Sequence, residues 1–150
     1  MEAGAHVEGD YPVQFVAYGE AKDDPALHLS ETTTLIGDNV RAGRILAAVS
    51  FLGPGNWTCW PPDGDSDRFE LAQLYTEIPG EFWGIQMVCR VPGIPEILTL
   101  VRQDDCVSIP EGHHLNIAGP GARIGYLRMM AARREGEDRR MSSASATIAG

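Results

Sequence analysis

Short apolar runs, each ended by turn-forming residues, recur along almost the whole chain. Many of the runs contain β-branched and aromatic residues, and glycine, proline, aspartate and asparagine fill the breaks between them. Short strands at close, regular spacing are typical of all-β sandwiches and barrels. The predicted strands are Pro12–Tyr18, Thr32–Ile36, Arg44–Leu52, Trp57–Trp60, Phe69–Glu77, Phe82–Val91, Ile97–Val101, Cys106–Ile109, His114–Ala118 and Arg123–Met130.

The runs divide the chain into three parts. Residues 1–30 form an N-terminal extension with one strand, and residues 31–132 form the barrel domain. Helical periodicity is weak until Tyr126–Arg134, which the pattern allows to be strand or helix. Residues 133–150 are charged and then small and polar, so they cannot bury enough apolar area to offset their ordering entropy. We expect that tail to be disordered.

Composition limits the partners and the compartment. The 150 residues carry a formal net charge of −9, which repels phosphate backbones and argues against nucleic-acid binding. No apolar run approaches the length of a membrane span. The N-terminus lacks the basic flank and apolar core of a secretory signal, and the 3 cysteines are an odd number. We therefore expect free thiols and a cytoplasmic location.

The segment Gly53–Asp65 is the richest in unusual residues. It places Trp57, Cys59 and Trp60 between two clusters of glycine and proline, which set the backbone of turns. We expect this segment to line the functional site.

Several motifs resemble the second cupin half of the 5-deoxy-glucuronate isomerases. The resemblance covers about residues 31–132 and implies a single cupin domain, a jelly-roll β-barrel, whereas the isomerases contain two cupins. The motifs that carry it are Ala42–Leu46, Gly53–Pro62, Leu71–Tyr75, Pro110–His114, Ala118–Gly121 and Gly125–Ala131.

The resemblance fails at the metal ligands. In the isomerase pattern, Pro-Pro is followed by His-x-His, a glutamate lies on the next strand, and a later histidine completes the site. Here those positions hold Asp63, Asp65, Gln73 and His114, so only the last is kept. Transition metals prefer imidazole nitrogen, and an amide is a poor ligand. We expect no catalytic metal and no cofactor, although Asp63, Asp65 and His114 could hold a weakly bound hard cation.

The former ligand positions also indicate which side chains face the barrel interior. Gln73 should point inward, and Tyr75 shares its parity on the strand. If positions 63 and 65 point inward, Trp57 and Cys59 do too, provided that Pro61-Pro62 adds no bulge.

We predict that Gln73 and His114 are catalytic and that Trp57, Cys59, Tyr75 and Met87 bind substrate. The structural alternatives are core packing for Trp57 and Met87, a small apolar filler for Cys59 and a hydrogen-bonded core histidine at position 114. As a nucleophile, Cys59 would need a base, for which His114 is the candidate.

In size, fold and ligand loss the chain is similar to the small cupin-type pericyclases of macrolactam and macrolide polyketide pathways. Those enzymes promote transannular 6+4 and 4+2 cycloadditions, which need a folded polyene rather than a metal. The resemblance implies a metal-independent cyclase acting on a hydrophobic small molecule in an apolar barrel pocket. The alternatives are a sugar isomerase with a rebuilt metal site and a non-catalytic cupin that binds a small molecule. We also expect a homodimer paired through Pro12–Tyr18.

Overall fold

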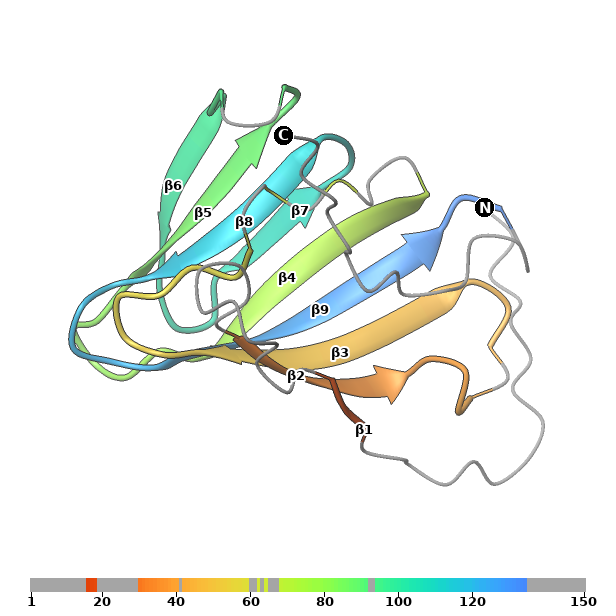
Figure 1. Cartoon of the computed structure of the whole chain (residues 1–150), viewed down its shortest axis with the longest axis horizontal. Helices are drawn as coiled ribbons and strands as arrows, with labels where there is room; N and C mark the ends of the chain where they lie inside the picture. The colour runs from red at the N-terminus through yellow and green to blue at the C-terminus, as the bar shows by residue number, and fades with distance from the viewer. Residues whose placement is uncertain are drawn as a thin grey trace, which may run out of the picture.

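The computed structural model describes residues 16–18, 30–40, 42–59, 62, 64, 68–91 and 94–134, and this part of the chain contains strands and no helix (Figure 1). The all-β prediction is therefore confirmed. No described helix is long and apolar enough to cross a membrane. The strands are β1 (Val16–Tyr18), β2 (Ser30–Ile36), β3 (Ile45–Leu52), β4 (Phe69–Glu77), β5 (Gly84–Cys89), β6 (Ile97–Val101), β7 (Cys106–Ile109), β8 (His113–Ala118) and β9 (Ile124–Ala132).

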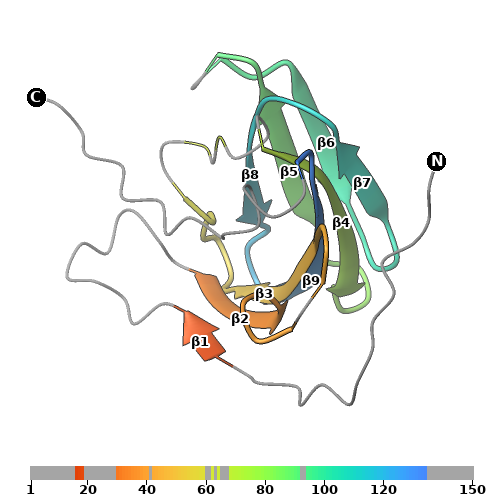
Figure 2. The ribbon, with the colours of Figure 1, turned by 90° about the vertical axis from the view of Figure 1, so that its right-hand side faces the viewer.

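The strands form two antiparallel sheets that face each other (Figures 1 and 2). The larger sheet has the order β1-β2-β3-β9-β4-β7, and the smaller has the order β6-β5-β8. Strand β1 falls within the predicted strand Pro12–Tyr18 and pairs with β2 at the end of the larger sheet. Residues 12–15 lie outside the described part, as does the tail beyond residue 134, so the predicted domain limits stay predictions.

The larger sheet buries its inward face through alternate residues. Paired residues of antiparallel strands point to the same side, and Met130 of β9 lies opposite both Leu46 of β3 and Leu71 of β4. These residues pack with Phe69 and Ile109 in one apolar cluster. The second interior cluster comprises Leu52, Tyr75, Ile78, Val101, Ala118, Ile124 and Tyr126.

A third apolar cluster lies on the outer face of the smaller sheet. Gln86 and Asn116 are paired and reach the interior, whereas their neighbours Met87 and Leu115 are paired and point the other way. Met87 and Leu115 pack with Cys59 and Cys89 rather than with either interior cluster. All three cysteines are thiols rather than halves of disulfides, as the sequence predicts.

The predicted strand Trp57–Trp60 does not form in the described residues up to Cys59. A turn comes first, in which Asn56 N donates to Gly53 O over 3.1 Å and Gly55 adopts a φ of 71°. That φ lies in the left-handed region that glycine enters without strain. The chain then runs beside β8, meeting it at the single bridge between Trp57 and Ile117. Trp60 lies outside the described residues.

Strand β9 resolves the ambiguity over Tyr126–Arg134. It is a strand from Ile124 to Ala132 because its alternate residues Ile124, Tyr126, Met130 and Ala132 all enter the interior clusters. A helix would not place residues two apart on one face.

Candidate functional site

A network of buried polar side chains crosses the space between the two sheets, centred on the hydroxyl of Tyr75. Tyr75 and Gln86 are 0% exposed and Asn116 is 1% exposed. Tyr75 Oη donates to Gln86 Oε1 over 2.8 Å and contacts the side-chain amide of Asn116. Tyr75 comes from the larger sheet and its partners from the smaller one, so the network joins the two layers.

The orientation of Gln86 fixes the direction of these hydrogen bonds. Its Nε2 donates to the backbone oxygens of Met87 and Leu115, each over 3.2 Å. Its Oε1 must therefore accept the single proton of Tyr75 Oη. Asn116 Oδ1 lies against the same hydroxyl and is a second acceptor for that proton.

Tyr126 extends the network toward β3. Its ring lies 5.6 Å from that of Tyr75, centroid to centroid, and its hydroxyl bonds with the side chains of Ser50 and Asn116. Burial raises the pKa of Tyr75 well above the usual 10.0, and Tyr126 and Asp105 add to this. Burial also raises the pKa of Tyr126, against the opposing effects of Arg128 and the two hydrogen bonds. Both phenols therefore stay neutral at physiological pH and serve as hydrogen-bond donors rather than as bases.

Gln73 lies beside this network with half of its amide unused. The side chain is 1% exposed, and its Oε1 lies 3.5 Å from Tyr75 Oη, a weak contact. Its Nε2 has no hydrogen-bond partner among the described residues. A buried donor without a partner costs about 1–3 kcal/mol, so such groups are rare and call for an explanation.

Arg128 stands next to Gln73 on the same inward face. It pairs with Gln73 of β4 and with Ala48 of β3, between the inward residues Tyr126 and Met130 of its own strand. The side chain is partly buried, and its Nε is covered. Among the described strand residues that point inward, Arg128 is the one that carries a full charge.

His114 is 4% exposed and shares the inward face of β8 with Asn116. Cys59 Sγ contacts the backbone oxygen of His114 at 3.9 Å and Thr58 Oγ1 at 3.7 Å, and the thiol packs in the cluster on the outer face of the smaller sheet. The structure favours the small apolar filler at position 59.

Trp57, Cys59 and Met87 do not line the interior, so the inward orientation expected for Trp57 and Cys59 is wrong. That these three residues bind substrate stays a prediction. Trp57 is 44% exposed and bridges Ile117, which packs against the outer cluster with Cys59 and Met87. Trp57 and Cys59 share one side of their segment, as predicted, but that side faces outward rather than into the barrel. The alternative that Trp57 packs in the core is also wrong, because its side chain is exposed.

The residues at the former metal positions do not fit a transition metal. Position 73 offers an amide, and Gln73 Oε1 is already turned toward Tyr75 Oη. His114 supplies an imidazole, but Asp63 and Asp65 lie outside the described residues. No group of three potential metal-ligating side chains occurs within the described ranges.

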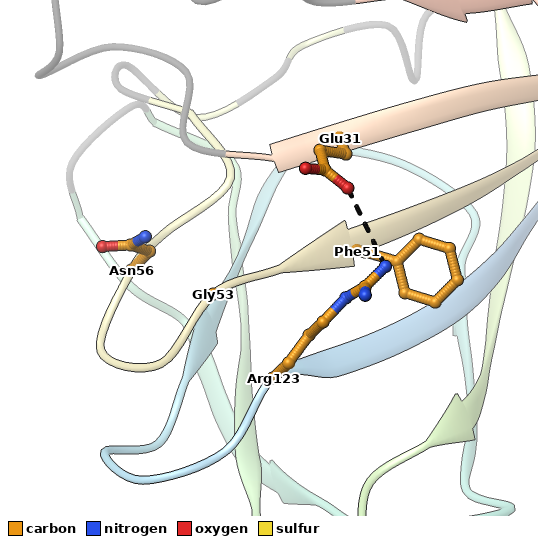
Figure 3. Close-up of a pocket in the computed structure, with 5 residues that line it drawn as sticks. All are labelled: Glu31, Phe51, Gly53, Asn56 and Arg123. Atoms are coloured by element: carbon orange, nitrogen blue, oxygen red, sulfur yellow. Dashed lines mark ion pairs between the residues drawn. The ribbon is translucent and has the colours of Figure 1, made fainter.

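A separate hollow of about 280 Å³ lies where β2, β3 and the start of β9 meet (Figure 3). Arg123 stacks over the ring of Phe51 at 3.9 Å and lies 3.8 Å from a carboxylate oxygen of Glu31. Gly53 and Asn56, from the segment expected to line the site, complete its wall. The hollow contains none of the predicted catalytic or substrate-binding residues, and its ion pair is exposed, which makes it weak.

Sequence reasoning found Gln73, Tyr75 and His114 and missed the rest of the interior polar set. The missed residues are Ser50, Gln86, Asn116, Tyr126 and Arg128. A signal for Gln86 and Asn116 was present, because each is a polar residue inside an apolar run. Tyr126 and Arg128 carried no such signal while their segment could be read as a helix.

The two buried tyrosines make alkaline pH destabilising. Their folded pKa values are raised, so their contribution is complete below the unfolded pKa near 10 and is lost as pH rises above it. Each phenol should lower the free energy of unfolding by up to about 1.4 kcal/mol per pH unit above that point. Urea unfolding between pH 8 and pH 11 measures the slope. Tyr126→Phe should flatten it, and an unchanged slope in that variant would contradict the assignment.

Solved structures share this fold at low sequence identity. An IolB-like protein from Salmonella typhimurium LT2 matches with a TM-score of 0.66 and 18% identity, over 82% of this chain and 49% of its own, so the present chain spans about half of that protein. The polyketide cyclase RemF from Streptomyces resistomycificus matches with a TM-score of 0.56 and 18% identity, over 97% of this chain and 89% of its own. A cupin-2 domain protein from Rhodospirillum rubrum gives a TM-score of 0.56 and 19% identity, over 81% and 71%.

The chain therefore has the cupin fold, as the sequence resemblance implies. No protein-family model matches the sequence, and no curated protein does so either.

Proposed function

We propose that the protein is a metal-independent cyclase that folds a polyketide-derived polyene for transannular 6+4 or 4+2 cycloaddition. The observation that supports this most directly is the row formed by Gln73 and Arg128 between the two apolar clusters of the interior. Leu71 and Met130 belong to one cluster, and Tyr75 and Tyr126 belong to the other. Hydrogen-bond donors thus stand between two apolar regions.

This arrangement suits a largely apolar molecule that carries a carbonyl oxygen. Apolar walls favour a compact fold of the substrate, and holding the reacting carbons together can replace much of the activation entropy. A donor such as Gln73 Nε2 would stabilise charge that develops on a carbonyl oxygen conjugated with the polyene. Of the predicted substrate-binding residues, Tyr75 keeps this place in the interior.

The likeness to a polyketide cyclase that spans nearly all of both chains also supports the proposal. The hydrophobic substrate and the homodimer are part of the same proposal. Strand β1 ends the larger sheet, and among the described strands it pairs with β2 alone, so we propose that a second copy pairs along its other edge. Light scattering should then give twice the chain mass of 16.3 kDa.

The test is conversion of polyene macrolactams by chelator-treated protein. A cycloaddition joins carbons by turning π bonds into σ bonds, so the mass stays constant while the polyene absorbance falls and new ring carbons appear by NMR. We expect turnover without added metal. Polyene turnover that needs one equivalent of a transition metal would contradict the metal-independent mechanism. Metal-dependent conversion of an aldose, without conversion of polyenes, would favour the rebuilt sugar isomerase site. Tight binding without turnover would favour the non-catalytic cupin.

A further inference from the structure

Gln73 and Arg128 together offer hydrogen-bond donors and a positive charge. A neutral polyene has no negative charge to pair with them. The two residues are paired across β4 and β9. Directly paired residues on one face of a sheet have Cβ atoms about 5 Å apart. A guanidinium and an amide at that spacing can both donate to one oxygen. Ala48, the partner of Arg128 on β3, is 0% exposed and has a small side chain.

Burial makes this pair suited to negative charge. Gln73 is 1% exposed and its Nε2 has no partner among the described residues, so an acceptor is missing from a buried donor. On the inward faces of β4, β8 and β9, the other titratable side chains are Tyr75, His114 and Tyr126. Charged donors in a low-dielectric interior bind an oxyanion much more strongly than in water.

We infer that Arg128 and Gln73 form an oxyanion site that takes the enolate oxygen of a 1,3-dicarbonyl group in the substrate. Such a group ionises readily, and its enolate is planar with negative charge on oxygen, which fits a planar guanidinium and one amide N–H. The site would also accept a carboxylate, which is the competing source of the same chemistry. The inference rests on the proposed function in placing the substrate in this interior, and it narrows the substrate class to polyketides with an unreduced β-dicarbonyl.

The position of Arg128 allows such a group to reach the site. Its side chain is partly buried and therefore in contact with solvent, whereas Gln73 and the neighbouring Tyr75 are closed off. Arg128 also acts on its surroundings inside the barrel, because its charge is felt by the Tyr126 hydroxyl.

The test uses pentane-2,4-dione as the probe and the ultraviolet band of its enolate as the readout. Protein binding should lower the apparent pKa of the diketone by about 1–3, since a nearby cation favours the charged form. Arg128→Gln should abolish the shift and Arg128→Lys should keep part of it. Gln73→Leu should make the pKa shift smaller by about one unit, which is about a tenfold change in the ionisation constant of the diketone. Arg123→Gln is the matched control, because that arginine lies in the outer hollow, and it should leave the shift intact.

The diketone and hexanoate experiments distinguish an enolate site from a carboxylate site and from no site. An unshifted diketone in the wild-type protein, or a shift that survives in Arg128→Gln, would overturn the oxyanion site. Hexanoate that competes with the diketone only when Arg128 is present supports the site. A carboxylate that binds while the diketone does not would overturn the enolate assignment. Urea unfolding of each variant checks that the fold is kept. A diketone shift without any conversion of polyenes would leave this site standing and remove the cyclase function.

Discussion

Leu46→Ala should lower the free energy of unfolding by about 2–5 kcal/mol. Leu46 is 0% exposed and packs with Phe69, Leu71 and Met130. Truncation therefore loses the transfer free energy of the side chain and leaves a cavity. Leu46 lies on β3 and these residues lie on β4 and β9, and the ladders of the three strands limit how far the cavity can collapse. Urea unfolding at neutral pH measures the change.

Leu98→Ala is the matched control for this truncation. Leu98 also lies on a strand, but it is 61% exposed. The same change there should alter the free energy of unfolding by no more than about 0.5 kcal/mol. Similar losses in both variants would mean that the exposed strand β6 is covered in solution. In that case a second copy of the chain would be the first candidate, and the two variants should also differ in association by light scattering.

The fold could be predicted from the sequence because many short apolar runs, each ended by turn residues, indicate strands independently of one another. Phe69–Glu77 and Ile97–Val101 appear with the predicted ends, since apolar alternation and turn residues agree at those positions. The motifs that resemble cupins lie on the strands and turns that bring β3, β9 and β4 side by side. A strand pattern determines which residues share a face, and in β4 that was enough to bring Gln73 and Tyr75 inside.

The face of the segment after Gly53 could not be predicted in the same way. A one-residue change in register moves every side chain to the other face, and the Pro-Pro pair lies between Cys59 and the reference positions. The pairing partner decides the face instead, because Trp57 follows Ile117 to the outer side of β8. Arg128 was missed for a different reason. A single arginine in a segment that fits both helix and strand patterns has no predictable direction.

Gln73→Leu should raise the free energy of unfolding by about 1–3 kcal/mol while lowering the rate of cyclisation by about 10²–10³-fold. The substitution removes a buried N–H that has no partner among the described residues, and leucine has a similar size. Tyr75 keeps its donor bond, because the 2.8 Å partner is Gln86 and the contact with Gln73 is 3.5 Å. A buried donor that costs stability fits a role in binding substrate.

Gln86→Leu is the matched control, because it removes a buried amide whose hydrogen bonds are all made. Gln86 is equally buried, but its amide is fully used by Tyr75 and by two backbone oxygens. Leucine there should leave those groups without partners and lower the free energy of unfolding by about 1–3 kcal/mol. The two variants make the same chemical change at positions of equal burial, so only the state of hydrogen bonding separates them. If both destabilise the protein alike, Gln73 is an ordinary member of the polar network, and the donor proposed to meet the substrate is already satisfied.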